Sequence, residues 1–246
     1  MTGVRVNVAR TPPARPVASG WSRPTLVDLD DLAGLRHEYQ DTGIDEAEVD
    51  PDPFAQFAAW FRAWRVLPIG EPNAMVVATA ADAATGGRPS ARTVLLKGVS
   101  HAGFVFYTNY ESRKGRELAA NPQATLLFSW HPVGRQVIVE GAVEHTTEAE
   151  ADAYWASRPR GSRLGAAASP QSEVVDGRAA LDARFADLDA RYATTEIPRP
   201  AHWGGFRVVP DRIEFWQGRA NRVHDRLSYE RDPGADSGWR LRRLAP

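Results

Sequence analysis

The stretch Ala74-Met75-Val76-Val77-Ala78-Thr79-Ala80 is where the chain changes from a helical to a strand-like pattern. It is short and apolar, and similar runs rich in Val, Leu and aromatic residues follow it. The strands predicted on this pattern are 74–80, 90–97, 104–109, 125–130, 136–144, 205–209, 212–217, 223–229 and 239–244. Turn-forming clusters such as Thr85-Gly86-Gly87-Arg88-Pro89 separate them. Many short strands with hairpin-length turns predict an antiparallel barrel or sandwich.

Helical patterns lie before and between these strands. Asp52 can cap a helix whose apolar stripe comprises Phe54, Phe57, Phe61 and Trp64. Further helices are predicted at about 29–39, 112–120, 147–157 and 178–192. The expected fold is therefore mostly β with flanking helices (α+β). Residues 25–246 are expected to form a single domain, and residues 1–24, rich in Pro, Arg and small residues, a mobile N-terminal tail.

Composition excludes several classes of protein. The chain has 246 residues, 43% of them hydrophobic, which is enough to bury a sizeable core. Its formal net charge of -1 gives no overall attraction to nucleic acid or membrane, so any anion site must be built locally. The absence of cysteine excludes disulfides and thiolate chemistry, and it fits a reducing cytoplasm. We expect neither a membrane span nor a secretory signal peptide, because no apolar run is long enough.

Familiar ligand-binding motifs are also missing from the sequence. Neither the G-x-G-x-x-G pattern of dinucleotide folds nor the G-x-x-x-x-G-K-[ST] pattern of P-loops occurs. The six histidines form no H-E-x-x-H or H-x-H pattern, so we expect no metal centre.

Basic residues instead gather at strand ends and helix starts. Arg92 opens the segment 92–97 and Lys97 closes it, but their odd spacing would point them to opposite faces of a regular strand. A shared ligand would then need a bulge, or a site wrapped around the end of the strand. Solvated strand ends would explain the same two residues.

The segment Ser112-Arg113-Lys114 opens a predicted helix. The free N–H groups and the dipole of a helix N-terminus suit a phosphate. Basic residues at that end oppose the dipole, so they are unfavourable unless an anion is bound. An ordinary exposed first turn fits the segment equally well.

Two further clusters follow. The first comprises Tyr154, Arg158, Arg160, Ser162 and Arg163. Tyr154 and Arg158 are four residues apart and would share a helix face, and hydroxyl and guanidinium groups that converge in this way suit a phosphate dianion. Arg222, His224 and Arg226 alternate where a strand is predicted to begin, so they would project from one face. Such a row is unfavourable unless it meets an anion or solvent, and a solvated edge strand would also explain it.

At these residues the chain resembles the pyridoxamine 5'-phosphate oxidase family, over essentially everything from Asp52 to Pro246. The segments that carry the resemblance are RTVLLK at 92–97, FYTNYESRKGREL at 106–118, RQVIVEG at 135–141, SRPRGS at 157–162, SPQS at 169–172, and then WGGFRV, IEFWQG, RVHDR and the closing RLAP.

The resemblance implies an FMN-binding split β-barrel that forms a homodimer with FMN at the subunit interface. The residues that match FMN contacts are Arg92, Lys97, Tyr107, Thr108, Arg113, Lys114, Gln136, Gln171, Ser172, Trp216 and Arg226. The residues that match the cradle of the substrate's phosphate are Lys97, Tyr154, Arg158 and Ser162. By the same match, Arg222 and His224 lie over the pyridine ring of the substrate as catalytic residues.

The implied reaction is the oxidation of pyridoxine 5'-phosphate and pyridoxamine 5'-phosphate to pyridoxal 5'-phosphate. Dioxygen is the acceptor, and hydrogen peroxide is released, with ammonia from the amine. Two phosphates, each with a charge of about -1.5 to -2, would explain why a nearly neutral chain gathers so many cations locally. Arg222 would orient the ring, and His224 would move a proton or position the ring.

Two positions depart from the family pattern. Ala167 stands where a Trp is expected, which loosens the wall near the substrate cradle, and Trp155 replaces the usual Phe beside Tyr154. Three alternatives stay open: a related flavin oxidase acting on another aromatic compound in a specialised pathway, a split-barrel reductase that uses a deazaflavin, and a non-catalytic flavin or pyridoxal-phosphate carrier. The first of these would not need the residues of the phosphate cradle.

Overall fold

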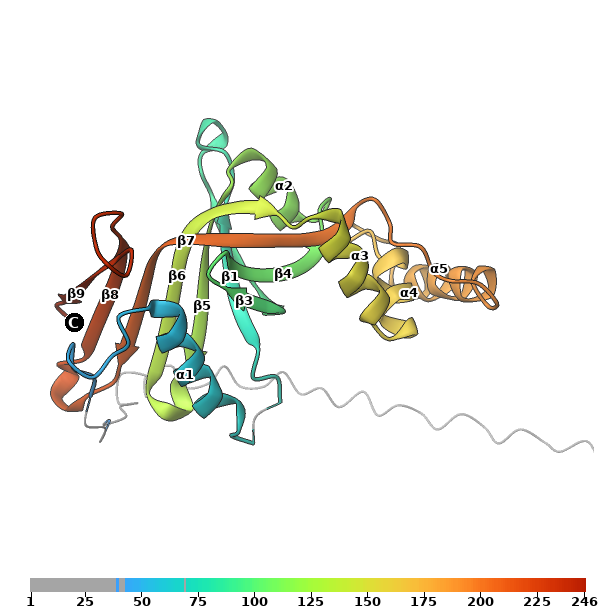
Figure 1. The fold of residues 1–246 in the computed structure, drawn as a ribbon. Helices are drawn as coiled ribbons and strands as arrows, with labels where there is room; N and C mark the ends of the chain where they lie inside the picture. The colour runs from blue at the N-terminus through green and yellow to red at the C-terminus, as the bar shows by residue number, and fades with distance from the viewer. Residues whose placement is uncertain (1–38, 40–42, 69) are drawn as a thin grey trace, which may run out of the picture. The chain divides into compact units, whose positions relative to one another are not determined.

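The computed structural model describes residues 39, 43–68 and 70–246. In this part of the chain one curled antiparallel sheet has helices beside it and at one end, as Figure 1 shows. The strands are β1 (Ala74–Ala80), β2 (Pro89–Leu95), β3 (Gly98–Ser100), β4 (Gly103–Asn109), β5 (Gln123–Trp130), β6 (Arg135–His145), β7 (Trp203–Gln217), β8 (Asp225–Arg231) and β9 (Trp239–Leu244). The α-helices are α1 (Pro53–Arg65), α2 (Arg113–Ala120), α3 (Glu148–Ser157), α4 (Arg160–Ala168) and α5 (Arg178–Arg191). The expected fold, mostly β with flanking helices, is confirmed.

The sheet curls around its longest strand, β7. The strand order is β2-β1-β5-β6-β7-β4-β3, and β8 and β9 continue from the second half of β7. The first half of β7 pairs with β4, and the second half pairs with β8. Between the halves the register against β6 shifts at Glu140/Gly141, where a β-carbon on Gly141 would lie 2.0 Å from the carbonyl oxygen of Val209. This bulge bends the ladder and lets one strand serve two parts of the curled sheet.

The core lies inside the curl and is mainly aromatic. Phe104, Phe128 and Phe215 are fully buried, and α1 contributes Phe57 and Trp60 from outside the sheet. The Phe57 ring meets the rings of Phe104 and Phe128 edge to face, each at a centroid distance of 5.0 Å. Each buried side chain of this size contributes about 1.5–3 kcal/mol relative to its exposure to water.

Local signals in the sequence explain where the helices begin. The Asp52 side chain accepts a hydrogen bond from the backbone N–H of Phe54 (3.0 Å), so it caps α1 as expected. Thr147 and Glu150 form a reciprocal capping box at the start of α3. Ser112 caps α2, which confirms the helix expected at 112–120.

Several expected boundaries need correction. The segments 205–209 and 212–217 belong to one strand, β7, because the bulge bends the ladder without ending it. The strand expected at 223–229 begins only at Asp225, since Asn221 and Arg222 adopt left-handed backbone angles in a single helical turn. The sequence pattern also missed α4. The helix expected at 29–39 and the tail expected at 1–24 lie outside the described residues, apart from Tyr39, which is not helical.

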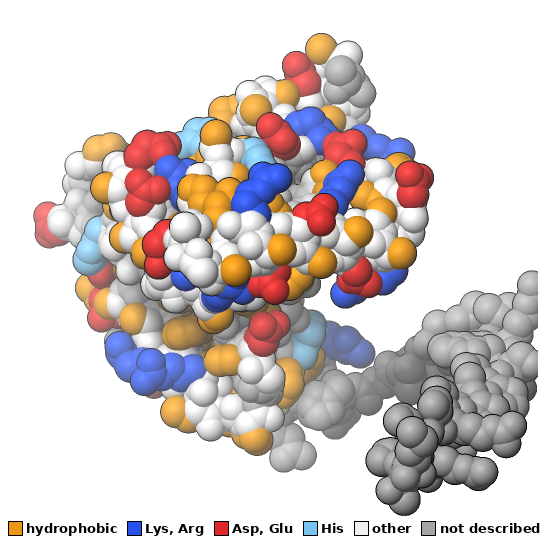
Figure 2. All heavy atoms as spheres, turned by 90° about the vertical axis from the view of Figure 1, so that its right-hand side faces the viewer, with side chains coloured by type: hydrophobic (Ala, Val, Ile, Leu, Met, Phe, Trp, Pro, Cys, Tyr) orange, Lys and Arg blue, Asp and Glu red, His pale blue; other side chains and the backbone are white. Residues whose placement is uncertain are grey.

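Helices α3, α4 and α5 gather at the end where β7 begins (Figure 1). Figure 2 views this end and shows acidic and basic side chains interspersed over the helices. Arg160 pairs here with Asp189, and Arg163 pairs with Glu196 at 2.8 Å. Both arginines, Arg160 half-exposed and Arg163 largely buried, are therefore already paired with carboxylates. In the described part of the chain, no helix is long and apolar enough to cross a membrane.

Candidate active site

A cavity of about 1000 Å³, here called the main pocket, lies between β2, the end of β4, the start of α2 and the segment from α3 to residue 172. Its volume is at the upper end of the range of about 300–1,000 Å³ that is common for ligand pockets. Eleven of the residues expected from the sequence line it, namely Arg92, Lys97, Tyr107, Thr108, Arg113, Lys114, Tyr154, Arg158, Ser162, Gln171 and Ser172. The fold thus brings together residues that are up to 80 positions apart.

The odd spacing of Arg92 and Lys97 is resolved by the end of β2. The strand stops at Leu95, and Lys97 follows in the link to β3. Both residues line the main pocket, so the site wraps around the end of the strand. Of the two arrangements that the spacing allowed, this one is present.

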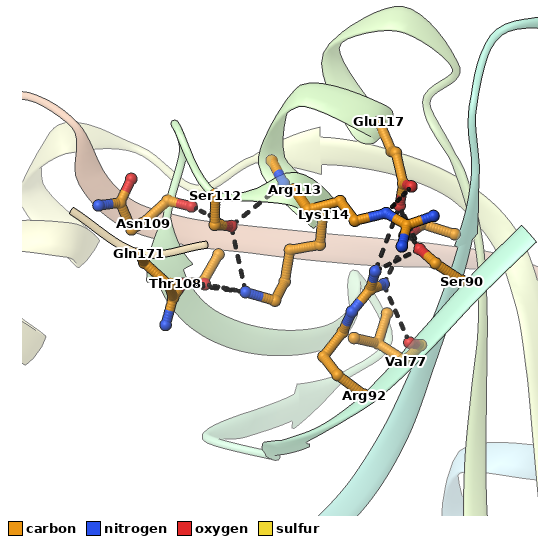
Figure 3. Close-up of polar contacts among 12 residues, drawn as sticks. Val77, Ser90, Arg92, Thr108, Asn109, Ser112, Arg113, Lys114, Glu117 and Gln171 are labelled. Atoms are coloured by element: carbon orange, nitrogen blue, oxygen red, sulfur yellow. Dashed lines mark hydrogen bonds and ion pairs between the residues drawn. The ribbon is translucent and has the colours of Figure 1, made fainter. Parts of the chain in front are cut away.

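The first turn of α2 forms a polar corner of the main pocket, seen in Figure 3. Ser112 accepts a hydrogen bond from the N–H of Gly115, and a β-carbon on Gly115 would lie 1.9 Å from the carbonyl oxygen of Tyr110. Glycine is therefore required for this close approach of helix and loop. The buried Lys114 ammonium donates to Thr108 (2.9 Å), Ser112 (3.1 Å) and the Gln171 side-chain oxygen (3.0 Å).

Lys114 is held among neutral acceptors. Burial lowers its pKa to about 8, and the nearby positive charge of Arg92 acts in the same direction, while Glu117 opposes both. A buried ammonium without a carboxylate in direct contact is unfavourable unless an anion joins it. This corner therefore favours an anionic ligand.

Arg92 and Arg113 share one buried carboxylate, that of Glu117. Arg92 Nη2 lies 3.2 Å from Glu117 Oε2, and Arg113 Nε lies 2.9 Å from Oε1 (Figure 3). Burial alone would raise the pKa of Glu117, but hydrogen bonds from Ser90, Thr79 and the two arginines outweigh it and lower the pKa to about 2. The carboxylate is therefore ionised across the physiological range.

The opposite wall of the main pocket is aromatic. The ring of Tyr107 stacks on Tyr154 with a centroid distance of 4.0 Å and lies parallel to Trp203 at 5.6 Å. Two cations rest on these rings: Lys97 Nζ lies 5.9 Å from the Tyr154 centroid, and Arg158 Cζ lies 4.7 Å from that of Trp203. Such contacts use ring faces and leave the N–H donors of the cation free.

Arg158 also has a hydrogen-bond donor without an acceptor. Its Nη1 atom is buried and has no hydrogen-bond partner among the described residues. Burial lowers the pKa of its guanidinium. Arg158 lies just after α3 with extended backbone angles, so it does not share a face of that helix with Tyr154 as expected. Ser162 lies in the first turn of α4 and is exposed in the same pocket. This wall, like the corner at α2, fits an anion that brings its own oxygens.

The segment after α4 closes the main pocket. Gln171 accepts hydrogen bonds from Thr108 (3.1 Å) and Lys114. Ser172 has a φ of 76°, in the left-handed region that a residue with a β-carbon rarely adopts. Such strain persists where the surroundings impose it, which is common at binding sites.

The other five expected residues do not line the main pocket. Gln136, Trp216 and Arg226 face each other across β6, β7 and β8, so their side chains share one face of the sheet. Arg226 donates to both oxygens of Glu214 (2.8 and 3.0 Å) and to the carbonyl of Ala245 (3.0 Å). The resemblance implies that these residues contact FMN at a subunit interface, and within this chain they form a second group.

Arg222 and His224 belong to this second group. The prediction that they project from one strand face with Arg226 is wrong, because Arg222 (φ 63°) lies in a tight turn before β8. The His224 ring packs at a tilted angle against Trp216, with a centroid distance of 4.8 Å. Its Nδ1 accepts a hydrogen bond from the N–H of Arg219 (3.1 Å), which leaves the ring proton on Nε2. Burial and then the charge of Arg222 lower the pKa of His224, so the imidazole is neutral at pH 7.

Comparison with known proteins identifies the family to which the chain belongs. The family model described as pyridoxamine 5'-phosphate oxidase matches residues 63–192, and the model of the pyridoxine 5'-phosphate oxidase C-terminal dimerisation region matches 203–246. The chain belongs to the pyridoxamine 5'-phosphate oxidase family. All residues of the main pocket except Trp203 lie in the first match, and most of the second group lies in the second match.

Curated members of this oxidase family are similar over most of the chain. The pyridoxine/pyridoxamine 5'-phosphate oxidase of Burkholderia thailandensis is 57% identical over 215 residues, which cover 87% of this chain and 99% of that protein. The protein of the same name from Burkholderia cenocepacia is 56% identical with the same coverage.

Two solved structures confirm the split-barrel fold of this family member. PhzG from Burkholderia lata, in complex with tetrahydrophenazine-1-carboxylic acid, has a TM-score of 0.76 and 31% identity, and the match covers 85% of this chain and all of that one. A pyridoxamine 5'-phosphate oxidase-related, FMN-binding protein from Nostoc punctiforme has a TM-score of 0.60 at 17% identity, which supports the fold alone.

Three residues of this oxidase-family site were not expected from the sequence. Glu117 and Trp203 hold the cations of the main pocket, and Tyr39 packs edge-on against Trp216 (5.6 Å) and His224 (5.7 Å). Trp203 and Glu117 lie inside the quoted family segments, but their role depends on contacts between distant elements. Tyr39 showed only as the last apolar residue of an amphipathic stripe.

Proposed function

We propose that this chain oxidises pyridoxine 5'-phosphate and pyridoxamine 5'-phosphate to pyridoxal 5'-phosphate. FMN would be the cofactor and dioxygen the acceptor, with release of hydrogen peroxide, and of ammonia from the amine. The family and the curated relatives support this reaction. The observation that carries the proposal is that the main pocket holds cations at two separate places, one at the start of α2 and one at the aromatic wall.

Two cationic places suit a cofactor and a substrate that each bring a phosphate. Arg113 and Lys114, with Thr108, Gln171 and Ser172 beside them, would hold the phosphate end of FMN. Arg158, Lys97 and Ser162 would hold the phosphate of the substrate, because the two cations keep free donors. When bound, FMN would supply the two-electron acceptor that no side chain offers.

The second group would complete the site from another copy of the chain. Gln136, Trp216 and Arg226 lie outside the main pocket of their own chain, and the model of the dimerisation region matches residues 203–246. We therefore propose a homodimer in which this group meets the flavin held by the partner. Arg222 would orient the substrate's ring, and His224, neutral at pH 7, would position it or accept a proton.

A flavin oxidase acting on another aromatic compound is the second candidate. The solved relative PhzG binds tetrahydrophenazine-1-carboxylic acid, which carries a carboxylate and no phosphate. A further cavity of about 380 Å³ beside Ala167 adjoins the main pocket, and Asn109 and Ser169 line both. Extra room there would suit a larger ring system. The free donors of Arg158 and Lys97 favour the phosphorylated substrate.

The test is anaerobic reduction of the purified protein, followed by its visible spectrum. Pyridoxine 5'-phosphate should bleach the flavin bands, and admitting air should restore them with pyridoxal 5'-phosphate formed. If the protein is yellow but this substrate does not bleach it, the proposed substrate is wrong, and the second candidate or a non-catalytic carrier remains. A protein that takes up no added FMN would contradict the proposal altogether. The cytoplasmic location expected from the lack of cysteine stays a prediction.

A further inference from the structure

Glu117 links β1, β2 and α2 beside the main pocket through one buried carboxylate (Figure 3). Its Oε2 accepts hydrogen bonds from Thr79 on β1 (2.5 Å) and Ser90 on β2 (2.6 Å), besides Arg92. Its Oε1 accepts from Arg113 Nε, within α2. The side chain therefore ties the first turns of α2 to the β1–β2 hairpin, from a residue that itself belongs to α2.

The hydrogen-bond donors of Arg92 are almost all in use. Its two terminal nitrogens carry four hydrogens, and they have four acceptors: the carbonyl of Val77 (3.3 Å), Thr79 (2.6 Å), Ser90 and Glu117 (3.2 Å). Against the described residues, only the Nε hydrogen of Arg92 remains for a ligand. Although Arg92 lines the main pocket, its guanidinium is mostly engaged in the hairpin.

The hydrogen-bond donors of Lys114 are also in use. An ammonium group carries three hydrogens, and those of Lys114 meet three acceptors, the oxygens of Thr108, Ser112 and Gln171. A phosphate that approached Lys114 would have to displace one of these oxygens. The charge of Lys114 attracts the phosphate, but its donors are already taken.

Arg113 differs from both neighbours. It is bound to Glu117 only through Nε, and neither of its terminal nitrogens has a hydrogen-bond partner among the described residues. Its side chain is 52% exposed, at the border of the main pocket. Held in this way, a guanidinium keeps both terminal NH₂ groups for a fork-like contact with a phosphate.

We propose that Glu117 is a positioning residue that gives Arg92, Arg113 and Lys114 different roles in binding the cofactor's phosphate. It fixes Arg92 in the hairpin and grips Arg113 by Nε, so that the terminal nitrogens of Arg113 are the ones that receive the cofactor's phosphate. The inference rests on the proposed function, because it takes that phosphate to be the one of FMN. Glu117 also reduces the charge of the three cations from +3 to +2, close to the charge of about -1.5 to -2 on a phosphate.

The test compares flavins with and without a phosphate. The full chain, freed of flavin, is titrated with FMN and with riboflavin, and quenching of the flavin fluorescence gives both dissociation constants. Glu117→Gln should weaken FMN binding about tenfold or more, because charge-assisted bonds hold the two arginines, and should leave riboflavin binding unchanged. If the carboxylate merely competed with the phosphate, the substitution would tighten FMN binding, and this result, or no change, would overturn the proposal.

Two further variants separate positioning from folding. Arg113→Gln alters a half-exposed side chain and should remove most of the preference for FMN over riboflavin even if Glu117→Gln does not fold. Arg92→Lys should lower the melting temperature and keep more of that preference than Arg113→Gln does; the reverse order would also overturn the proposal. Glu230→Gln, which breaks the Arg242–Glu230 pair (3.0 Å) away from the main pocket, is the matched control and should change neither constant. If the native chain showed no preference for FMN, the proposed function itself would fail.

Discussion

Single side chains in the main pocket carry charges that only a ligand would balance. Lys114 is the clearest case, because burial and the neighbouring Arg92 lower its pKa to about 8. Its charge therefore depends on pH within a range where lysines are normally all protonated. The protonation of Lys114 is therefore coupled to the binding of a phosphate.

This shift predicts how FMN affinity depends on pH. A phosphate dianion binds the protonated ammonium, so the free protein must take up a proton at pH values above the lowered pKa of Lys114. FMN affinity should fall as pH rises from about 8 towards 9.5, by up to roughly tenfold per pH unit. Titration of flavin fluorescence over pH 6.5–9.5 measures it. Lys114→Arg, which stays charged, should flatten the profile, and an equal slope in both proteins would contradict the assignment.

Arg158 predicts a different selectivity at the aromatic wall. Its guanidinium rests on the ring of Trp203 and its Nη1 lacks an acceptor, so Arg158→Met should remove donors that only the substrate's phosphate satisfies. We expect KM for pyridoxine 5'-phosphate to rise about tenfold to a hundredfold, since bonds to charged groups contribute about 1.5–3 kcal/mol. Arg160→Met is the control and should leave KM unchanged, because it breaks only contacts with α5 and its end, namely the ion pair with Asp189 and hydrogen bonds to the carbonyls of Asp189 and Tyr192.

At the scale of elements, α1 closes the open side of the aromatic core. Phe57 is 2% exposed and meets Phe104 and Phe128 edge to face. Phe57→Ala should lower the free energy of unfolding by about 3–5 kcal/mol, measured by chemical denaturation. Val66→Ala, at an exposed residue just after the helix, should stay within about 0.5 kcal/mol. Equal effects of the two changes would show that α1 does not depend on this contact.

Local patterns in the sequence were sufficient for most elements. The capping residues Asp52 and Ser112 and the apolar runs of β1 and β9 placed their boundaries within one or two residues. The pattern failed where the backbone departs from regular geometry. The bulge at Gly141 and the left-handed turn at Asn221 depend on contacts with neighbouring strands, which periodicity does not record.

At the scale of the whole molecule, the candidate site divides into two groups. The family segments supplied the right residue types, but the sequence did not reveal that Gln136, Trp216 and Arg226 lie apart from the main pocket. The sequence also did not reveal Glu117 and Trp203 as partners of the cations. Their contacts join residues that only the fold brings together, and residue spacing in the sequence does not record them. The division is the main reason to propose a shared site.

A shared site predicts complementation between two inactive variants. Arg158→Met damages the first group and Arg222→Met the second, so each homodimer should be nearly inactive at substrate concentrations near or below the native KM. When the two are co-expressed, half of the dimers should be mixed, and each mixed dimer should keep one intact site. Activity of about a quarter of the native level is therefore expected. If both groups served the same chain, mixing would restore nothing.

The most direct measurement is a crystal structure of the protein with FMN and pyridoxal 5'-phosphate bound. We expect the two phosphates at the two cationic places of the main pocket, one within hydrogen-bond distance of the terminal nitrogens of Arg113 and the other of Arg158. Gln136, Trp216 and Arg226 of a second copy should then lie against the flavin. A flavin bound outside the main pocket, or a single phosphate spanning both places, would contradict the proposed function.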